Sequence, residues 1–378
     1  MNYDLSEEEK AIVKRITSLA ASEVGLNHQT DTLSDNPAQV RRALLPWASA
    51  LVRAGYLNPC LTRPDGPGVG FVCAQEALAA LAPSVYWSLE MGLAVIARLL
   101  TAYGHGWQRD FLLPQFTEGR LLGGLAVCEG HQSLDANALQ TVAVPDGEDF
   151  RLSGVKPQVI NASVADWLVV AAMAPEGPGL FLLSAEASGL KISPRLPTLS
   201  FRGTPVADLT LEGCLIPAEQ ALAIERGPQA IAALRFWEDQ ALTAAGLGIM
   251  QRSLIAARKH AKEHQSAGRP IIAYQEIGFK LAEMLTLFQT AQLLAQRAAW
   301  LAKINDREAA VTAVCAKVFC TEAAETVASQ AMQVLGSRGL IAGNPVEEGY
   351  RDAKQLQIWG TSSEIARVKI GDLVLQFY

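Results

Sequence analysis

Two neighbouring segments near the C-terminus decide the fold of this chain. They read Gly349-Tyr350-Arg351-Asp352-Ala353 and, after a short spacer, Ile358-Trp359-Gly360-Thr361-Ser362-Ser363-Glu364-Ile365-Ala366-Arg367. The first contains adjacent opposite charges, Arg351 and Asp352, which by themselves indicate an exposed or structural pair. The second places a glycine directly before a run of hydroxyl residues and a carboxylate.

The region around these segments, from about residue 226 to the end, has helical periodicity. Residues 230–262, 271–303 and 308–335 predict consecutive long helices, too long for a mixed α/β unit. They therefore predict a helical bundle.

Working outward, the pattern changes twice more. Between about 121 and 225, short apolar runs such as 167–170 and 180–183 alternate with turn signals, which predicts a β-domain. Residues 1 to about 120 indicate helices, and Ser6 with Glu9 predicts a capping box at the start of the first one. Helices, strands and helices in this order predict an α+β protein.

Composition narrows the function classes. The chain has 378 residues, of which 50% are hydrophobic, with a net charge of −6, which argues against nucleic acid or an anionic membrane as the main partner. No apolar run approaches the ~18 residues of a membrane span, and the acidic N-terminus does not resemble a signal peptide. The six cysteines form no CxxC pair, which predicts reduced thiols and a cytoplasmic location.

The two C-terminal segments resemble the signature of the acyl-CoA dehydrogenases, which reads roughly Y-R-D-A, a spacer, and I-Y-E-G-T-S-E-I-x-R. The resemblance extends over essentially the whole chain. It implies the acyl-CoA dehydrogenase fold, with an N-terminal all-α domain (1–120), a middle β-barrel-like domain (121–225) and a C-terminal four-helix bundle (226–378). It also implies flavin-dependent α,β-dehydrogenation of an acyl-CoA or acyl-carrier thioester, with electron-transfer flavoprotein as a possible partner.

The same resemblance implies FAD as cofactor, although several contact positions differ from the family pattern. His264 replaces a phosphate-binding Arg, and a neutral imidazole donates one hydrogen bond where Arg offers a cationic fork. Gly336 and Gly339 belong to a loop that lets backbone N–H groups approach an anion. The implied cofactor contacts are Cys128, Leu134, Gln158, Ile160, His264, Gln275, Gln333, Gly336, Gly339, Ser362 and Glu364. Whether this chain binds FAD alone therefore stays open.

The catalytic base is the second departure, because the usual base position of the signature is Gly360 here. Glu238 matches the base of a minority branch that includes isovaleryl-CoA and long-chain enzymes. It shares a predicted helical face with Leu242, Ala245 and Ile249. The alternative is a partly solvated acid near a helix N-terminus. The implied substrate contacts are Leu134, Asp239, Trp359, Gly360 and Arg367, with Asp239 standing where the family usually has Arg.

Other candidates are weaker. His131 lies in the predicted nucleotide loop, where a histidine is more often solvated. Cys128 is either a reactive thiol or a small buried hydrophobe. His260 and His264 share a helical face, but no further ligand completes a zinc set, so we expect no metal.

Three functions remain open. The first is an acyl-CoA dehydrogenase with Glu238 as base. The second is a FAD-poor subunit of a heteromeric relative, like those of bacterial steroid catabolism, in which two homologous chains share a site. The third is an acyl-thioester-binding protein without redox chemistry. Either a homo-oligomer or a heteromer is expected, with a role in lipid or steroid catabolism.

Overall fold

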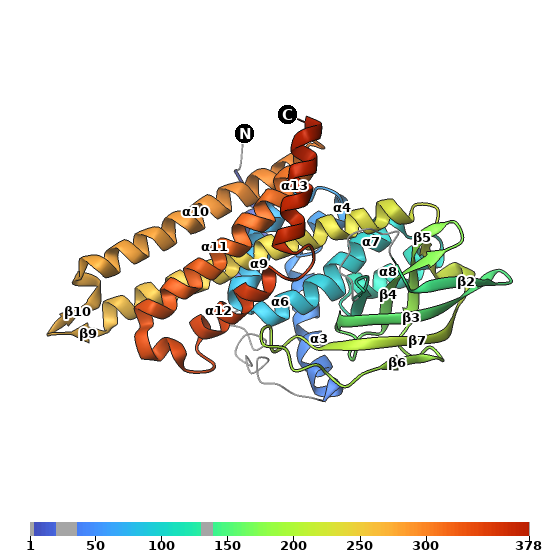
Figure 1. Ribbon diagram of the computed structural model, residues 1–378, viewed down its shortest axis with the longest axis horizontal. Helices are drawn as coiled ribbons and strands as arrows, with labels where there is room; N and C mark the ends of the chain where they lie inside the picture. The colour runs from blue at the N-terminus through green and yellow to red at the C-terminus, as the bar shows by residue number, and fades with distance from the viewer. Residues whose placement is uncertain (1–3, 20–35, 130–138, 378) are drawn as a thin grey trace.

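The computed structural model describes residues 4–19, 36–129 and 139–377. Figure 1 shows a helical region, a twisted sheet at one end of the molecule, and long helices that extend away from the sheet. The order helices, strands, helices confirms the predicted α+β layout. The division near residues 120 and 225 remains a proposal.

The described part of the N-terminal region, residues 4–19 and 36 to Thr117, is mainly helical. Its helices are α1 (Glu7–Ser18), α3 (Pro37–Ala54), α4 (Asn58–Thr62), α5 (Val69–Leu81), α6 (Pro83–Leu89), α7 (Val95–Tyr103) and α8 (Leu113–Thr117), with π-helical turns η3 (Glu90–Ala94) and η4 (Gln108–Leu112). The capping box is confirmed: the Ser6 hydroxyl accepts from the Glu9 N–H, and the Glu9 carboxylate accepts from the Ser6 N–H. These contacts satisfy two N–H groups that the first helical turn leaves open.

The apolar stretch Pro83–Tyr103 is 21 residues long and could cross a membrane by length and composition alone. The expectation that no apolar run approaches this length is therefore wrong. The structure gives the stretch another explanation, because 89% of its most apolar window is buried inside the protein. A core helix needs apolar residues on every face.

The middle region forms one eight-stranded sheet in the order β6-β7-β3-β1-β4-β5-β8, with β2 paired to β3 and β4. The strands are β1 (Gly123–Ala126), β2 (Val142–Asp146), β3 (Asp149–Ile160), β4 (Trp167–Ala174), β5 (Gly177–Ser184), β6 (Leu190–Ile192), β7 (Val206–Ile216) and β8 (Ala221–Ala223). The predicted apolar runs form β4 and β5. The ladder between β3 and β7 shifts register between Lys156 and Val159. Such a bulge re-aims the side chains beside it, here at the end of β3 nearest the helices.

The C-terminal region confirms the three predicted long helices. They are α9 (Gly227–Glu263), α10 (Gln275–Lys303) and α11 (Ala309–Leu335), followed by α12 (Pro345–Leu356) and α13 (Ser363–Phe377). A short hairpin of β9 (Gln265–Ser266) and β10 (Arg269–Pro270) joins α9 to α10, and the turn η8 (Gly336–Leu340) follows α11.

Helix α9 connects the whole molecule. It begins beside the sheet, passes between the N-terminal helices and α11, and ends at the far tip of the bundle (Figure 1). Its middle is buried on all sides, and two glycines allow this close packing. A Cβ on Gly246 would lie 2.9 Å from the Cys320 carbonyl oxygen of α11, and one on Gly248 would lie 2.6 Å from the Ala79 Cβ of α5. These glycines let the middle of α9 pack between α11 and α5, while α9 also packs against β5 of the sheet.

Candidate functional site

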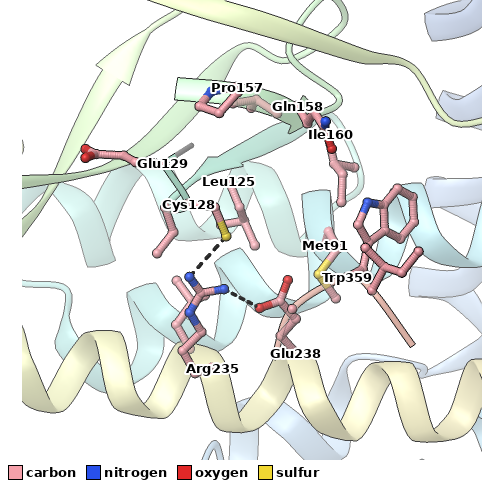
Figure 2. Close-up of a pocket in the computed structure, with 15 residues that line it drawn as sticks. Met91, Leu125, Cys128, Glu129, Pro157, Gln158, Ile160, Arg235, Glu238 and Trp359 are labelled. Atoms are coloured by element: carbon pink, nitrogen blue, oxygen red, sulfur yellow. Dashed lines mark hydrogen bonds and ion pairs between the residues drawn. The ribbon is translucent and has the colours of Figure 1, made fainter. Parts of the chain in front are cut away.

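A cavity of about 190 Å³ lies where β1 and β3 of the sheet meet α9 and the segment 358–360. The sheet contributes mainly aliphatic side chains, and α9 contributes two charged ones, Arg235 and Glu238 (Figure 2). Three parts of the sequence, near residues 128, 158 and 358, thus converge on one helix. The cavity contains Glu238 and Gly360, the two positions that sequence reasoning connected with the base.

Glu238 occupies the space that a side chain on Gly360 would enter. A Cβ built on Gly360 would lie 3.2 Å from the Glu238 carboxyl carbon and 2.8 Å from the Cδ1 atom of Leu242. Gly360 also has a φ of +62°, a conformation that residues with a Cβ rarely adopt. A carboxylate at position 238 and a side chain at position 360 would therefore occupy the same space. A carboxylate on α9 needs a glycine on the facing loop.

The predicted stripe on α9 is buried below this carboxylate. Leu242, Ala245 and Ile249 are each at most 2% exposed, whereas the Glu238 side chain is 12% exposed and lines the cavity. Glu238 therefore lies at the end of the stripe with its carboxylate directed into a mostly enclosed space. The solvated-acid alternative does not describe this environment.

Arg235 is the cavity residue that sequence reasoning missed. Its Nη1 donates to Glu238 Oε2 at 2.8 Å, and its Nη2 donates to the Cys128 sulfur at 3.1 Å (Figure 2). Burial lowers the pKa of Arg235, but the Glu238 carboxylate and the Cys128 sulfur raise it to above its ordinary value, so the guanidinium keeps its charge. The spacing of three residues from Glu238 on one helix was a signal for the ion pair. The contact with Cys128 had no signal in the sequence.

A second ion pair fixes the sheet side of the cavity. Lys156, whose side chain is fully buried, lies 2.6 Å from Glu129, and the Glu129 carboxylate also accepts from the backbone N–H of Thr141 at 2.9 Å. Burial raises the pKa of Glu129, but these donors outweigh it and lower the pKa to about 2. Glu129 is therefore held as an anion beside Cys128.

Asp239 points away from the cavity into a buried polar cluster. It is 4% exposed, and its Oδ1 atom has no hydrogen-bond partner among the described residues. Burial first, and then the neighbouring Glu238 charge, raise the pKa of Asp239 to about 7, while the Lys317 and Lys369 charges lower it. Lys317 donates to the Thr361 carbonyl oxygen at 2.5 Å, which ties this cluster to the loop at Gly360.

Only the first part of the segment 358–367 lines the cavity. Trp359 and Gly360 line the cavity, and the Trp359 ring stacks on Trp87 with centroids 5.2 Å apart. Glu364 is exposed at the start of α13, and Arg367 pairs with Glu322 at 2.6 Å. Ser362, between Gly360 and Glu364 in the sequence, does not line the cavity. The predicted roles of Ser362, Glu364 and Arg367 remain predictions.

The other implied cofactor residues fall into two groups. Gln158, with a φ of +53°, and Ile160 line the cavity from β3. The rest lie at the tip of the bundle remote from the sheet, where α9 and α11 end and α10 begins (Figure 1): His264, Gln275, Gln333, Gly336 and Gly339. His264 stacks on His260 with ring centroids 4.8 Å apart. Leu134 and His131 lie outside the described residues. Within the ranges that the structure describes, no cluster of three His, Cys, Asp or Glu residues could hold a metal.

The cavity lining can be tested against the ring of FAD, the cofactor that the resemblance implies. A flavin ring needs an apolar surface with polar groups at its edge. Leu125, Val127 and Ile160 supply the apolar surface, and the Gln158 amide and the Cys128 thiol supply polar atoms. The side chains present therefore fit the ring, with an apolar surface on one side and an amide and a thiol as the polar groups. At the tip of the bundle, Gly336, with a φ of +59° and no atom within 4 Å of a built Cβ, leaves backbone open to a phosphate.

Comparisons with known proteins agree with this architecture. Residues 124–214 match the family model for the acyl-CoA dehydrogenase middle domain, and residues 221–375 match the model for the acyl-CoA dehydrogenase C-terminal domain. The chain is 33% identical over 283 residues to the mitochondrial short-chain specific acyl-CoA dehydrogenase of Rattus norvegicus, covering 73% of this chain and 68% of that one.

Two further similarities extend over the full length. The probable acyl-CoA dehydrogenase YngJ of Bacillus subtilis (strain 168) is 27% identical over 402 residues, with 100% of both chains covered. The structure of butyryl-CoA dehydrogenase from Megasphaera elsdenii superimposes with a TM-score of 0.89 at 23% identity, covering 99% of this chain and 100% of that one. This superposition confirms the predicted fold.

Proposed function

Because the chain belongs to the acyl-CoA dehydrogenase family, we propose that it catalyses the α,β-dehydrogenation of an acyl-CoA or acyl-carrier thioester with Glu238 as the base. One observation carries this proposal: the Glu238 carboxyl carbon lies 3.2 Å from the point where a Gly360 side chain would begin. A carboxylate from α9 thus reaches the space beside the usual base position.

The residues of the cavity suit removal of an α-proton. The reaction needs a carboxylate in a space that excludes most water, since desolvation strengthens a base and protects the carbanionic transition state. Glu238 meets the first condition, and the aliphatic walls with Trp359 meet the second. FAD, when bound, supplies the acceptor for the hydride that leaves the β-carbon. Electron-transfer flavoprotein is the proposed acceptor for the electrons afterwards.

Glu238→Gln tests the base directly. The amide keeps the shape of the side chain but cannot take a proton, so we expect the turnover of butyryl-CoA with an artificial electron acceptor to fall by at least about 100-fold. Flavin released per subunit should be unchanged, which separates catalysis from cofactor loss. Glu148→Gln, which changes an exposed carboxylate in the turn between β2 and β3, is the control and should keep full activity. Full activity of Glu238→Gln would contradict the assignment.

A second candidate is a FAD-poor subunit that completes a site with a homologous chain. It is favoured by the residues at the tip of the bundle, where His264 offers a stacked imidazole in place of a guanidinium. This candidate predicts substoichiometric flavin in the chain expressed alone and recovery of flavin and activity after co-expression with an intact homologue. Stoichiometric flavin in the chain alone would exclude it. For either candidate we propose a cytoplasmic location, since all six cysteines are free thiols.

A further inference from the structure

The guanidinium of Arg235 joins a nucleophile to a carboxylate across the cavity. Its Nη2 lies 3.1 Å from the Cys128 sulfur, and its Nη1 lies 2.8 Å from Glu238. Figure 2 shows the three side chains as one continuous array along the cavity wall. The base function proposed above uses only the carboxylate, so it gives the thiol and its cation no part in the chemistry.

Cys128 differs from the other five cysteines of the chain. Burial raises the pKa of Cys60 and Cys73 to about 12, and it also raises the pKa of Cys214, Cys315 and Cys320. Cys128 alone among the six lines the cavity and contacts a guanidinium. The thiolate is the reactive form of cysteine, and a neighbouring cation stabilises it.

The charges that face Cys128 come from two elements. Helix α9 presents Arg235 and Glu238, and the sheet side presents the Lys156–Glu129 pair. The charges of the two cations and the two carboxylates cancel. Arg235 is the cation that donates a hydrogen bond to the Cys128 sulfur. Arg235 is therefore the cation placed to favour reaction at the Cys128 sulfur.

We propose that Cys128 is a covalent acceptor site for α,β-unsaturated acyl thioesters, in which its sulfur adds to the β-carbon while Glu238 delivers a proton to the α-carbon. The S–H bond of Cys128 breaks and its proton passes to the Glu238 carboxylate. A carbon–sulfur bond forms as the double-bond electrons move to the α-carbon, and Glu238 then gives the same proton to that carbon. No oxidant, reductant or leaving group is required. The chemical class follows from the cavity, which places a soft nucleophile and a proton carrier around one acyl site.

This inference rests on the proposed function, because the unsaturated thioester is the product of that reaction. The adduct is a thioether that keeps the entire thioester. Its reversal needs the same two groups, since the base removes the α-proton and the thiolate leaves. Cys128 would thereby retain the product in the cavity and slow its release.

The test uses the full chain incubated with crotonyl-CoA, followed by intact-mass measurement and peptide mapping. We expect one adduct with the mass of the complete crotonyl-CoA, located on Cys128 and absent from Cys128→Ser. Cys315→Ser, which removes another partly exposed thiol, is the matched control and should still form the adduct. An adduct that carries only the acyl group would mean attack at the carbonyl and would overturn the proposal, as would labelling at another cysteine or none.

Variants of Arg235 and Glu238 distinguish the effect of the guanidinium on the sulfur from proton delivery by the carboxyl group. In Arg235→Leu, alkylation of Cys128 by iodoacetamide at pH 7 should slow by about tenfold, because the sulfur loses the cation that donates to it at 3.1 Å. Arg235→Lys should restore part of the rate and guards against a folding defect in the leucine variant. An unchanged alkylation rate in both variants would overturn the role of the guanidinium.

Glu238→Gln should lose the crotonyl-CoA adduct but keep iodoacetamide alkylation, which needs no proton donor. Equal adduct formation in this variant would contradict proton delivery by Glu238. Failure of the proposed function is distinguishable: a chain that forms the adduct without oxidising butyryl-CoA keeps the inference and loses the function. A chain that oxidises butyryl-CoA without forming the adduct would keep the proposed function and overturn the inference.

Discussion

At the scale of single residues, the relation between Gly360 and Glu238 can be tested by adding one methyl group. Gly360→Ala would place a Cβ 2.8 Å from the Leu242 Cδ1 atom and 3.2 Å from the Glu238 carboxyl carbon, at a φ of +62°. The backbone strain alone costs about 1–2 kcal/mol, and the clash displaces the proposed base. We therefore expect lower unfolding free energy in urea and a large loss of activity.

Gly343→Ala is the matched control for this prediction. Gly343 also has a positive φ, +84°, but no atom lies within 4 Å of its built Cβ. The two variants should share the stability loss from backbone strain, and only Gly360→Ala should lose activity. Equal activities in the two variants would show that Gly360 does not provide room for Glu238.

Asp239 predicts a pH dependence of stability. Its pKa is about 7 in the folded chain, above the ordinary aspartate value of 3.8, because burial and the Glu238 charge disfavour ionisation. The folded state therefore binds more protons than the unfolded state between these values, and stability falls as pH rises through this window. One such group contributes a slope of at most about 1.4 kcal/mol per pH unit.

Asp239→Asn removes this titration, so urea unfolding between pH 4 and pH 8 should show a shallower decline than in the unsubstituted chain. Asp372→Asn, at an exposed position of α13, should leave the slope unchanged. Parallel slopes for Asp239→Asn and the unsubstituted chain would mean that Asp239 does not titrate in this window.

At the scale of elements, the glycines of α9 serve close packing against neighbouring helices, at a cost in helix propensity. Alanine is a better helix former than glycine by up to about 1 kcal/mol, yet a Cβ on Gly248 would lie 2.6 Å from both the Ala79 Cβ and the Ala80 nitrogen of α5. Gly248→Ala should therefore destabilise the chain by about 1–3 kcal/mol, the usual cost of overpacking. Gly278→Ala on α10, where no atom lies within 4 Å, should stabilise it. Thermal unfolding of the two variants in opposite directions is the expected result, and destabilisation of both would contradict it.

The elements also show what the sequence could predict. Helical periodicity is a local signal, so α9, α10 and α11 were predicted to within a few residues of their ends. The apolar stretch Pro83–Tyr103 was missed because Glu90 and Arg98 interrupt its apolar residues in the sequence. The π-helical turn within it, η3, has no sequence signal at all.

The same limit applies to the site. Glu238 was identified from a motif and a helical stripe, both readable along the chain. Arg235 was missed because one of its partners, Cys128, lies 107 residues away, and packing alone brings the two together. Asp239 was expected at the substrate, but adjacent residues on a helix point about 100° apart, so Asp239 faces the Lys317 cluster instead.

At the scale of the whole molecule, the C-terminal helices leave large apolar side chains exposed in this single chain. Phe279 and Leu293 on α10 are 55% and 58% exposed, and Val368 on α13 is 61% exposed. Apolar surfaces of this kind mark interfaces. The residues implied in cofactor binding, His264 and Gln275 among them, lie near the α10 end of this surface, so assembly and flavin content should change together.

We therefore expect sedimentation to show an oligomer and Phe279→Glu to dissociate it, since a carboxylate buried in an interface is strongly unfavourable. Flavin per subunit should fall in the same variant, because the tip of the bundle would lose its neighbour. Phe111→Glu changes an equally exposed phenylalanine, 59% exposed, on η4 at a distance from α10 and should alter neither quantity. A monomer with stoichiometric flavin would contradict the link, since the described chain would then hold the cofactor without a second copy.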